Sequence, residues 1–65
     1  MVGLTGTTVL PVSERIGRVS VYDKFGTLHM LKCCVRKGAE PIPKGQRVVL
    51  VKYKRLRNLY VVGRA

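Results

Sequence analysis

Apolar and polar residues alternate with a period of two along several short stretches of this chain, and such alternation predicts β-strands. The clearest stretch is 16–23, where Val19 and Val21 share one face and the polar residues between them share the other. The turn residues 24–26 follow, and Gly26 can adopt positive φ. We therefore expect the chain to turn back after this strand and form a hairpin.

The segment before this strand also predicts β structure. Residues 3–10 are rich in glycine and β-branched side chains, and the stretch stops at Pro11, which cannot donate to a sheet ladder. Residues 12–15 then form a corner, because Gly17 follows too soon after Ser13 for a helix to continue. The glycines of the first strand indicate close approach of neighbouring backbone, since no helix follows them to complete a phosphate-binding loop.

The return strand of the hairpin, 27–36, is long, and its apolar phase slips. Apolar side chains occupy even positions in its first half and odd positions from Cys33 onward. One face of a regular strand cannot bury both sets, so we expect a bulge near Leu31 and Lys32. Long bulged strands that serve two sheet surfaces are what a small barrel needs to close.

The second half of the chain predicts two further strands. The loop 37–45 contains two prolines and two glycines, and it separates three strands from the final pair, 46–53 and 58–62, which are joined through 54–57. Five short strands in a three-plus-two arrangement predict an all-β fold, a small and strongly bent five-stranded barrel.

The last hairpin has apolar side chains on both phases of its first strand. Leu59 and Val61 share a face, and we expect them to lie opposite Val48 and Leu50. Tyr53 lies on the other phase, so either both sides of the first strand are covered or that strand bulges.

Length and charge then narrow the class of protein. A chain of 65 residues forms one small domain. Its 13 Lys and Arg against three acidic residues give a formal net charge of +10, which attracts polyanions such as nucleic acid, anionic lipid or an acidic protein face. The alternative is a solvated basic surface that keeps a small barrel in solution.

The residues that carry chemistry are few, and we expect no enzyme, no metal and no cofactor. Adjacent strand residues point to opposite faces, so Cys33 and Cys34 predict one buried and one exposed thiol in a reducing compartment. His29 stands among apolar residues and is interpreted as a partly buried strand residue, not a catalytic base. The three carboxylates show no paired spacing.

Two patterns bear on a partner. Single-strand nucleic-acid binders with an OB-type barrel combine a basic groove with aromatic rings on which bases stack. Tyr22 and Tyr60 occupy outward phases of their strands near basic residues, which makes nucleic acid one candidate partner.

A family resemblance covers nearly the whole chain. The runs GLTGTTVLP at 3–11, IGRV at 16–19, IPKGQRVVLV at 42–51 and LYVV at 59–62 resemble the C-terminal soluble domain of NfeD-like proteins. They are also similar to the related OB-fold domain of YqiJ-like bacterial membrane proteins. The matching residues are glycines, a proline and alternating apolar positions, all of which have structural roles.

The resemblance implies a five-stranded OB-like barrel that is the soluble part of a longer membrane protein, on the cytoplasmic side of the membrane. It implies a non-catalytic interaction domain that contacts a partner of stomatin or flotillin type. Such domains often have a more acidic or neutral surface than this chain, and an anionic membrane surface would suit the difference.

We therefore expect residues 1–65 to form a single OB-like β-barrel domain, membrane-associated and non-catalytic, with a protein partner or an anionic lipid surface. The alternative is an OB-fold module that binds single-stranded nucleic acid through Tyr22 and Tyr60. The residues expected to contact the partner are Arg18, Lys52, Lys54, Arg55, Arg57 and Tyr60.

Overall fold

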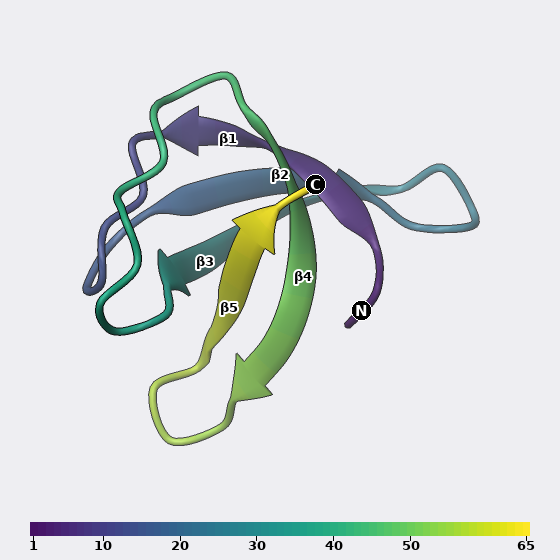
Figure 1. The fold of residues 1–65 in the computed structure, drawn as a ribbon. Helices are drawn as coiled ribbons and strands as arrows, with labels where there is room; N and C mark the ends of the chain where they lie inside the picture. The colour runs from purple at the N-terminus through teal and green to yellow at the C-terminus, as the bar shows by residue number, and fades with distance from the viewer.

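The computed structural model describes residues 1–65 and confirms an all-β fold (Figure 1). Each expected strand is present, with ends that differ by a few residues. The strands are β1 (Thr5–Leu10), β2 (Arg18–Tyr22), β3 (Leu28–Val35), β4 (Arg47–Lys54) and β5 (Leu59–Arg64).

The five strands close into one barrel in the order β1-β2-β3-β5-β4, and β4 pairs with β1 to complete it. All neighbouring pairs are antiparallel except β3 and β5, which run parallel. This is the small five-stranded OB-like barrel expected from the sequence. The β4–β5 hairpin extends beyond the body of the barrel, as does the β2–β3 turn on another side (Figure 1).

The barrel interior holds one main core that consists mostly of valine side chains. Fully buried residues include Val19 and Val21 from β2 and Leu50 from β4. Val12 in the β1–β2 connection and Ile42 in the β3–β4 connection form an isolated β-bridge. This bridge joins the two connections at one end of the barrel. The complete core cluster is Val12, Val19, Val21, Cys33, Val35, Ile42, Val48, Leu50 and Val62.

Thr8 explains why the proline-rich connection lies close against the barrel. Its side chain is buried, and its hydroxyl donates to the Pro43 carbonyl at 2.8 Å while accepting from the Gln46 amide at 2.9 Å. A buried hydroxyl with both roles satisfied adds no unpaired polar group to the core.

The bulge expected near Leu31 and Lys32 is absent, and that prediction is wrong. The β2–β3 register continues without a shift from Tyr22 opposite Leu28 to Arg18 opposite Lys32. The even-phase residues Leu28 and Met30 are each 48% exposed, so the apolar phase slips because the first half of β3 carries apolar side chains on its outer face. No bulge is needed to bury them.

The bulge lies instead in β4, at Val51. Leu50 pairs with Val62 and Lys52 pairs with Val61, so one extra β4 residue stands between two consecutive residues of β5. The pairing expected for Leu59 and Val61 with Val48 and Leu50 is therefore wrong. A smaller irregularity interrupts the β1–β2 register between Thr8 and Leu10.

Gly6 has the close backbone approach expected of the first strand's glycines, but the same expectation is wrong for Gly3. A Cβ on Gly3 would meet nothing within 4 Å, and this glycine instead has a positive φ of 95°. A Cβ built on Gly6 would lie 2.5 Å from the Ser20 carbonyl oxygen. No helix of this chain is long and apolar enough to cross a membrane.

Candidate nucleic-acid interface

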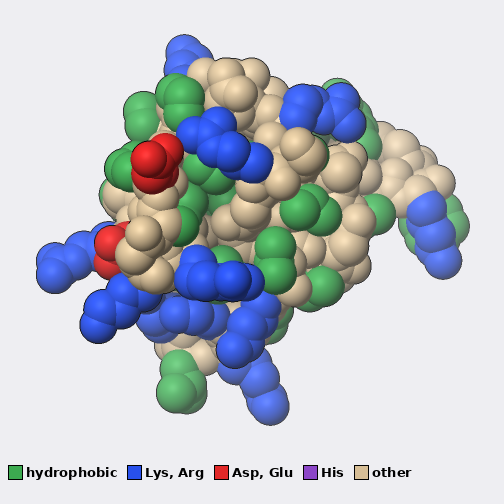
Figure 2. Space-filling view, in the orientation of Figure 1, with side chains coloured by type: hydrophobic (Ala, Val, Ile, Leu, Met, Phe, Trp, Pro, Cys, Tyr) green, Lys and Arg blue, Asp and Glu red, His purple; other side chains and the backbone are tan.

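The basic side chains of this protein have no acidic partners within it. The structure contains one ion pair, between His29 Nε2 and Asp23 Oδ2 at 2.8 Å, and none of the 13 Lys and Arg belongs to it. On the face drawn in Figure 2, blue side chains gather at the lower end, over the β4–β5 hairpin, and red ones lie at the left margin. The charge is therefore available to an external anion.

The β4–β5 hairpin has two chemically different faces. Tyr53 lies opposite Tyr60, whereas Lys52 lies opposite Val61 and Lys54 lies opposite Leu59. Successive strand residues point to opposite sides, so one side carries the two rings and the other carries the lysines. Tyr60 packs against the main core, which places the aromatic face on the barrel side. The outward phase expected for Tyr60 is therefore wrong, because Tyr60 shares the inward phase of Val62.

The two tyrosines form an aromatic pair near the turn end of the hairpin, next to the last ladder pair, Lys54 and Leu59. Their ring centroids are 4.8 Å apart with an interplanar angle of 50°, within the range of favourable tilted pairs. The Tyr53 hydroxyl donates to Asn58 Oδ1 at 2.6 Å, and Asn58 is the one non-glycine residue with positive φ, at 53°. This bond joins the two arms of the hairpin and fixes the orientation of the Tyr53 ring.

A notch of about 230 Å³ opens beside these rings. Arg18 and Lys32, which lie opposite each other in the β2–β3 ladder, contribute the two cations. No carboxylate lines the notch, so both cations are free to meet an anion there. The residues that line the notch are Arg18, Met30, Leu31, Lys32, Tyr53, Asn58 and Tyr60.

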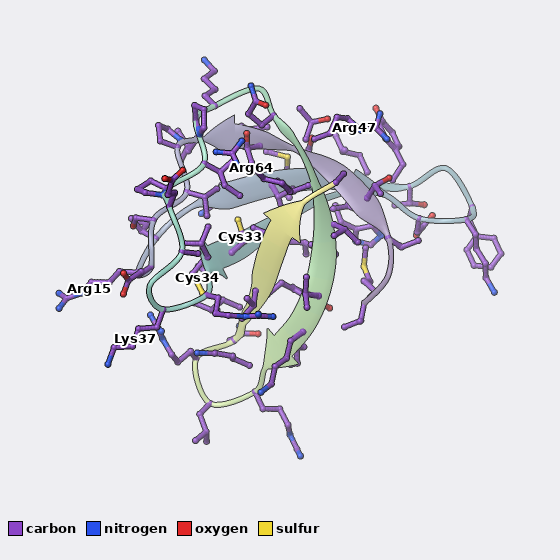
Figure 3. All side chains as sticks on the ribbon, in the orientation of Figure 1. Arg15, Cys33, Cys34, Lys37, Arg47 and Arg64 are labelled. Atoms are coloured by element: carbon purple, nitrogen blue, oxygen red, sulfur yellow. The ribbon has the colours of Figure 1, made fainter.

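The opposite face of the hairpin borders a second depression, which we call the groove. It consists of two hollows of about 410 and 240 Å³ that share Lys37 and Lys54 as lining residues. Arg15 and Lys37 reach out on the same side of the molecule, from the β1–β2 and β3–β4 connections (Figure 3). One carboxylate, Glu14, lies among the groove's cations, and its Oε2 accepts the Gly38 amide at 3.3 Å. The cations that line the groove are Arg15, Arg36, Lys37, Lys52, Lys54 and Arg57.

The six residues expected to contact a partner do not form one surface. Arg18 and Tyr60 line the notch. Lys52, Lys54 and Arg57 line the groove on the other side of the hairpin. Arg55 is exposed near the hairpin tip and lines neither.

Sequence reasoning missed two parts of the notch. Lys32 is found by counting pairs back from the β2–β3 turn, which places it opposite Arg18. Tyr53 requires the Val51 bulge to be located first, because the bulge decides which face Tyr53 joins. Tyr22, the other ring expected to stack a base, is 65% exposed on β2 and does not line the notch.

The expectation of one exposed thiol is wrong, because Cys33 and Cys34 are both 1% exposed. Cys33 belongs to the main core. Cys34 points to the opposite side, where it packs in a small cluster with Leu59 and Val61. Burial, and secondarily the neighbouring Cys34, raises the pKa of the Cys33 thiol to about 11.

His29 and Asp23 meet at the base of the β2–β3 turn. Asp23 Oδ1 also accepts the amides of Phe25 at 2.8 Å and Thr27 at 3.0 Å. The hydrogen bond with His29, and after it the one with the Thr27 amide, lowers the pKa of Asp23. Neither side chain lines the notch or the groove, and the pair closes a turn.

No protein-family model, no curated protein and no solved structure matches this chain. The NfeD-like and YqiJ-like resemblance therefore stays a prediction.

Proposed function

We propose that this domain is a non-catalytic OB-like module that binds single-stranded nucleic acid at the notch. The observation that carries the proposal is the Tyr53–Tyr60 pair, which borders an open hollow together with two cations and no carboxylate. Aromatic rings beside a basic surface are the combination with which OB folds bind single strands without sequence preference. The sequence suggested Tyr22 and Tyr60 for this role, and the geometry favours Tyr60 with Tyr53.

The notch has the chemistry to hold one nucleotide. A base has two apolar faces, and Met30 and the tyrosine rings offer it apolar contact on the wall of the notch. Arg18 and Lys32 are placed to contact the phosphates on either side of that base, because they lie side by side in the ladder. Base stacking on an aromatic ring contributes about 1–3 kcal/mol per base.

Fluorescence anisotropy with a labelled oligothymidylate at physiological salt tests this proposal. Tyr60→Leu keeps apolar packing against the core but removes one of the two rings that border the notch, and it should weaken binding by about 5- to 150-fold, the equivalent of one stacked base. Tyr60→Phe is the matched control and should bind within about threefold of the unchanged protein, since a phenyl ring also stacks. Wild-type protein that does not saturate at concentrations of about 10⁻⁴ M, or Tyr60→Leu protein that binds normally, contradicts the proposal.

A second candidate rests on Leu56. This leucine is 103% exposed at the tip of the β4–β5 hairpin, between Arg55 and Arg57. An apolar side chain flanked by cations is suited to an anionic membrane surface, where each nearby Lys or Arg contributes about 1 kcal/mol. This feature agrees with the membrane-associated, cytoplasmic-side domain implied by the NfeD-like resemblance, whose stomatin- or flotillin-type partner stays a prediction.

Flotation with vesicles of phosphatidylserine and phosphatidylcholine tests this second candidate. Leu56→Ser should lower the bound fraction if the tip inserts, while Leu10→Ser, at an exposed leucine on β1, serves as the control. Equal binding of both variants to the vesicles excludes insertion of the tip.

A further inference from the structure

We propose that the groove is a second phosphate-binding surface for the same strand, so that the β4–β5 hairpin stands between two parts of one extended site. This inference rests on the proposed function, because the strand is taken to place a base in the notch. It extends that function by giving a role to the six cations on the other face of the hairpin.

The notch and the groove are joined through consecutive residues of the hairpin. Tyr53 lines the notch and Lys54 lines the groove, and in the same way Asn58 lines the notch and Arg57 the groove. A strand that leaves the notch over the hairpin therefore meets Lys54 and Arg57 directly. Beyond them it meets the cations of the two connections.

The groove brings together six cations from three parts of the chain. Its cations come from the β1–β2 connection, the start of the β3–β4 connection and the hairpin, with Glu14 as the one carboxylate among them. Lys52, Lys54 and Arg36 line the same hollow as Val61, which is only 6% exposed. The charged ends are left without partners in the protein.

The shape of the groove favours a single chain of phosphates over a membrane. Arg15 and Lys37 from the connections and Lys54 and Arg57 from the hairpin line one hollow of about 410 Å³. A flat bilayer would lie across this hollow and leave it unfilled. A single strand can enter it and contact cations of the connections and of the hairpin.

Two oligothymidylates, of about 4 and about 15 nucleotides, separate the notch from the groove, because OB folds have site sizes in this range. The groove variant is Arg15→Gln/Lys37→Gln/Arg57→Gln. The control variant, Lys24→Gln/Lys44→Gln/Arg47→Gln, removes the same charge from exposed positions that line neither the notch nor the groove.

Each phosphate contact with a single strand contributes about 0.7 to the slope of log K against log salt. The slope for the 15-mer should therefore be smaller in magnitude by about 2 in the groove variant than in the wild type. The loss of 15-mer affinity in this variant, relative to the wild type, should shrink about 20-fold as the salt concentration rises from about 50 to about 200 mM. Its affinity for the 4-mer should stay within about threefold of the wild type at 200 mM salt, where general charge effects are screened.

Three results would overturn the inference. In the first, the groove variant binds the 15-mer with an unchanged salt slope. In the second, the control variant loses as much affinity for the 15-mer as the groove variant does. In the third, the groove variant loses binding to phosphatidylserine vesicles but not to the 15-mer. Failure of the proposed function is seen separately, because in that case Tyr60→Leu leaves binding of the 4-mer unchanged.

Discussion

Gly6 has the least room for a side chain of all the glycines in this chain, and this allows a prediction of stability. In a Gly6→Ala variant the new methyl carbon would lie 2.5 Å from the Ser20 carbonyl oxygen and 2.7 and 2.9 Å from methyl groups of Val21 and Val19. A carbon to oxygen contact normally exceeds about 3.3 Å, so β1 and β2 would have to separate by about 0.8 Å. Both strands are fixed in the barrel ladder, so the methyl group has no flexible neighbour to displace.

The expected loss follows from these contacts. Overpacking typically costs about 1–3 kcal/mol, and the upper part of that range applies because a backbone carbonyl is the closest atom. Reduced freedom of the unfolded chain returns about 0.5 kcal/mol, which leaves a net destabilisation of about 1.5–2.5 kcal/mol. A core of this size rarely supplies more than about 3–5 kcal/mol, so much of the stability would be lost.

Urea unfolding followed by circular dichroism measures this loss. With an m-value of about 1 kcal/mol per molar, near the low end for small proteins, the midpoint should fall by about 2 M. Gly63→Ala is the matched control, because its methyl group would meet nothing closer than Val51 Cγ2 at 3.6 Å. It should be neutral or slightly stabilising. A Gly6→Ala midpoint equal to that of Gly63→Ala would refute the reasoning.

Two further predictions concern titratable groups. The pKa of Asp23 is lowered from 3.8 in the folded protein, first by the hydrogen bond with His29 and then by the Thr27 amide, so its contribution is present above about pH 4 and is lost as the pH falls through the folded value. Urea midpoints measured from pH 7 to pH 2 should therefore fall less steeply below about pH 4 in Asp23→Asn than in the wild type or in a Glu40→Gln control. Equal pH dependence of the midpoint in the three proteins would contradict a stabilising role of the Asp23 carboxylate. With its pKa raised to about 11 by burial, Cys33 should react with Ellman's reagent at pH 8 at a small fraction of its rate in denaturing urea, and rapid native labelling of either thiol would contradict the buried arrangement.

Alternation along the chain was enough to predict the strands, because a barrel with one interior face requires that period. The same pattern predicted burial wrongly where an apolar side chain lies on the exposed face of a strand. Leu28 and Met30 are half exposed, and nothing in the sequence separates them from core residues of the same type. The prediction for the two cysteines was wrong in the opposite direction. Strand alternation predicts that Cys34 is exposed, but a small outer cluster with Leu59 and Val61 buries it.

The candidate site was only partly predictable for a related reason. The basic hairpin is visible in the sequence, and the outward phase of Arg18 was predicted from its strand, but Tyr60 was assigned the wrong phase because it packs against the core. The cations that the connections bring to the groove, among them Arg15 and Lys37, are far from the hairpin in sequence. Their convergence depends on how the barrel closes, which is a tertiary property with no local signal.

The bulge at Val51 is the feature from which both surfaces arise. In a regular strand Lys52 would share the inward face of Leu50, because residues two apart point the same way. The extra residue reverses the phase, so that Leu50 stays with Val62 in the core while Lys52 lies opposite the outward-facing Val61. The same reversal turns Tyr53 toward Tyr60 and the notch. A hairpin without the bulge would direct its lysines toward the barrel and leave Tyr60 unpaired, so one inserted residue sets both the aromatic face and the cationic face.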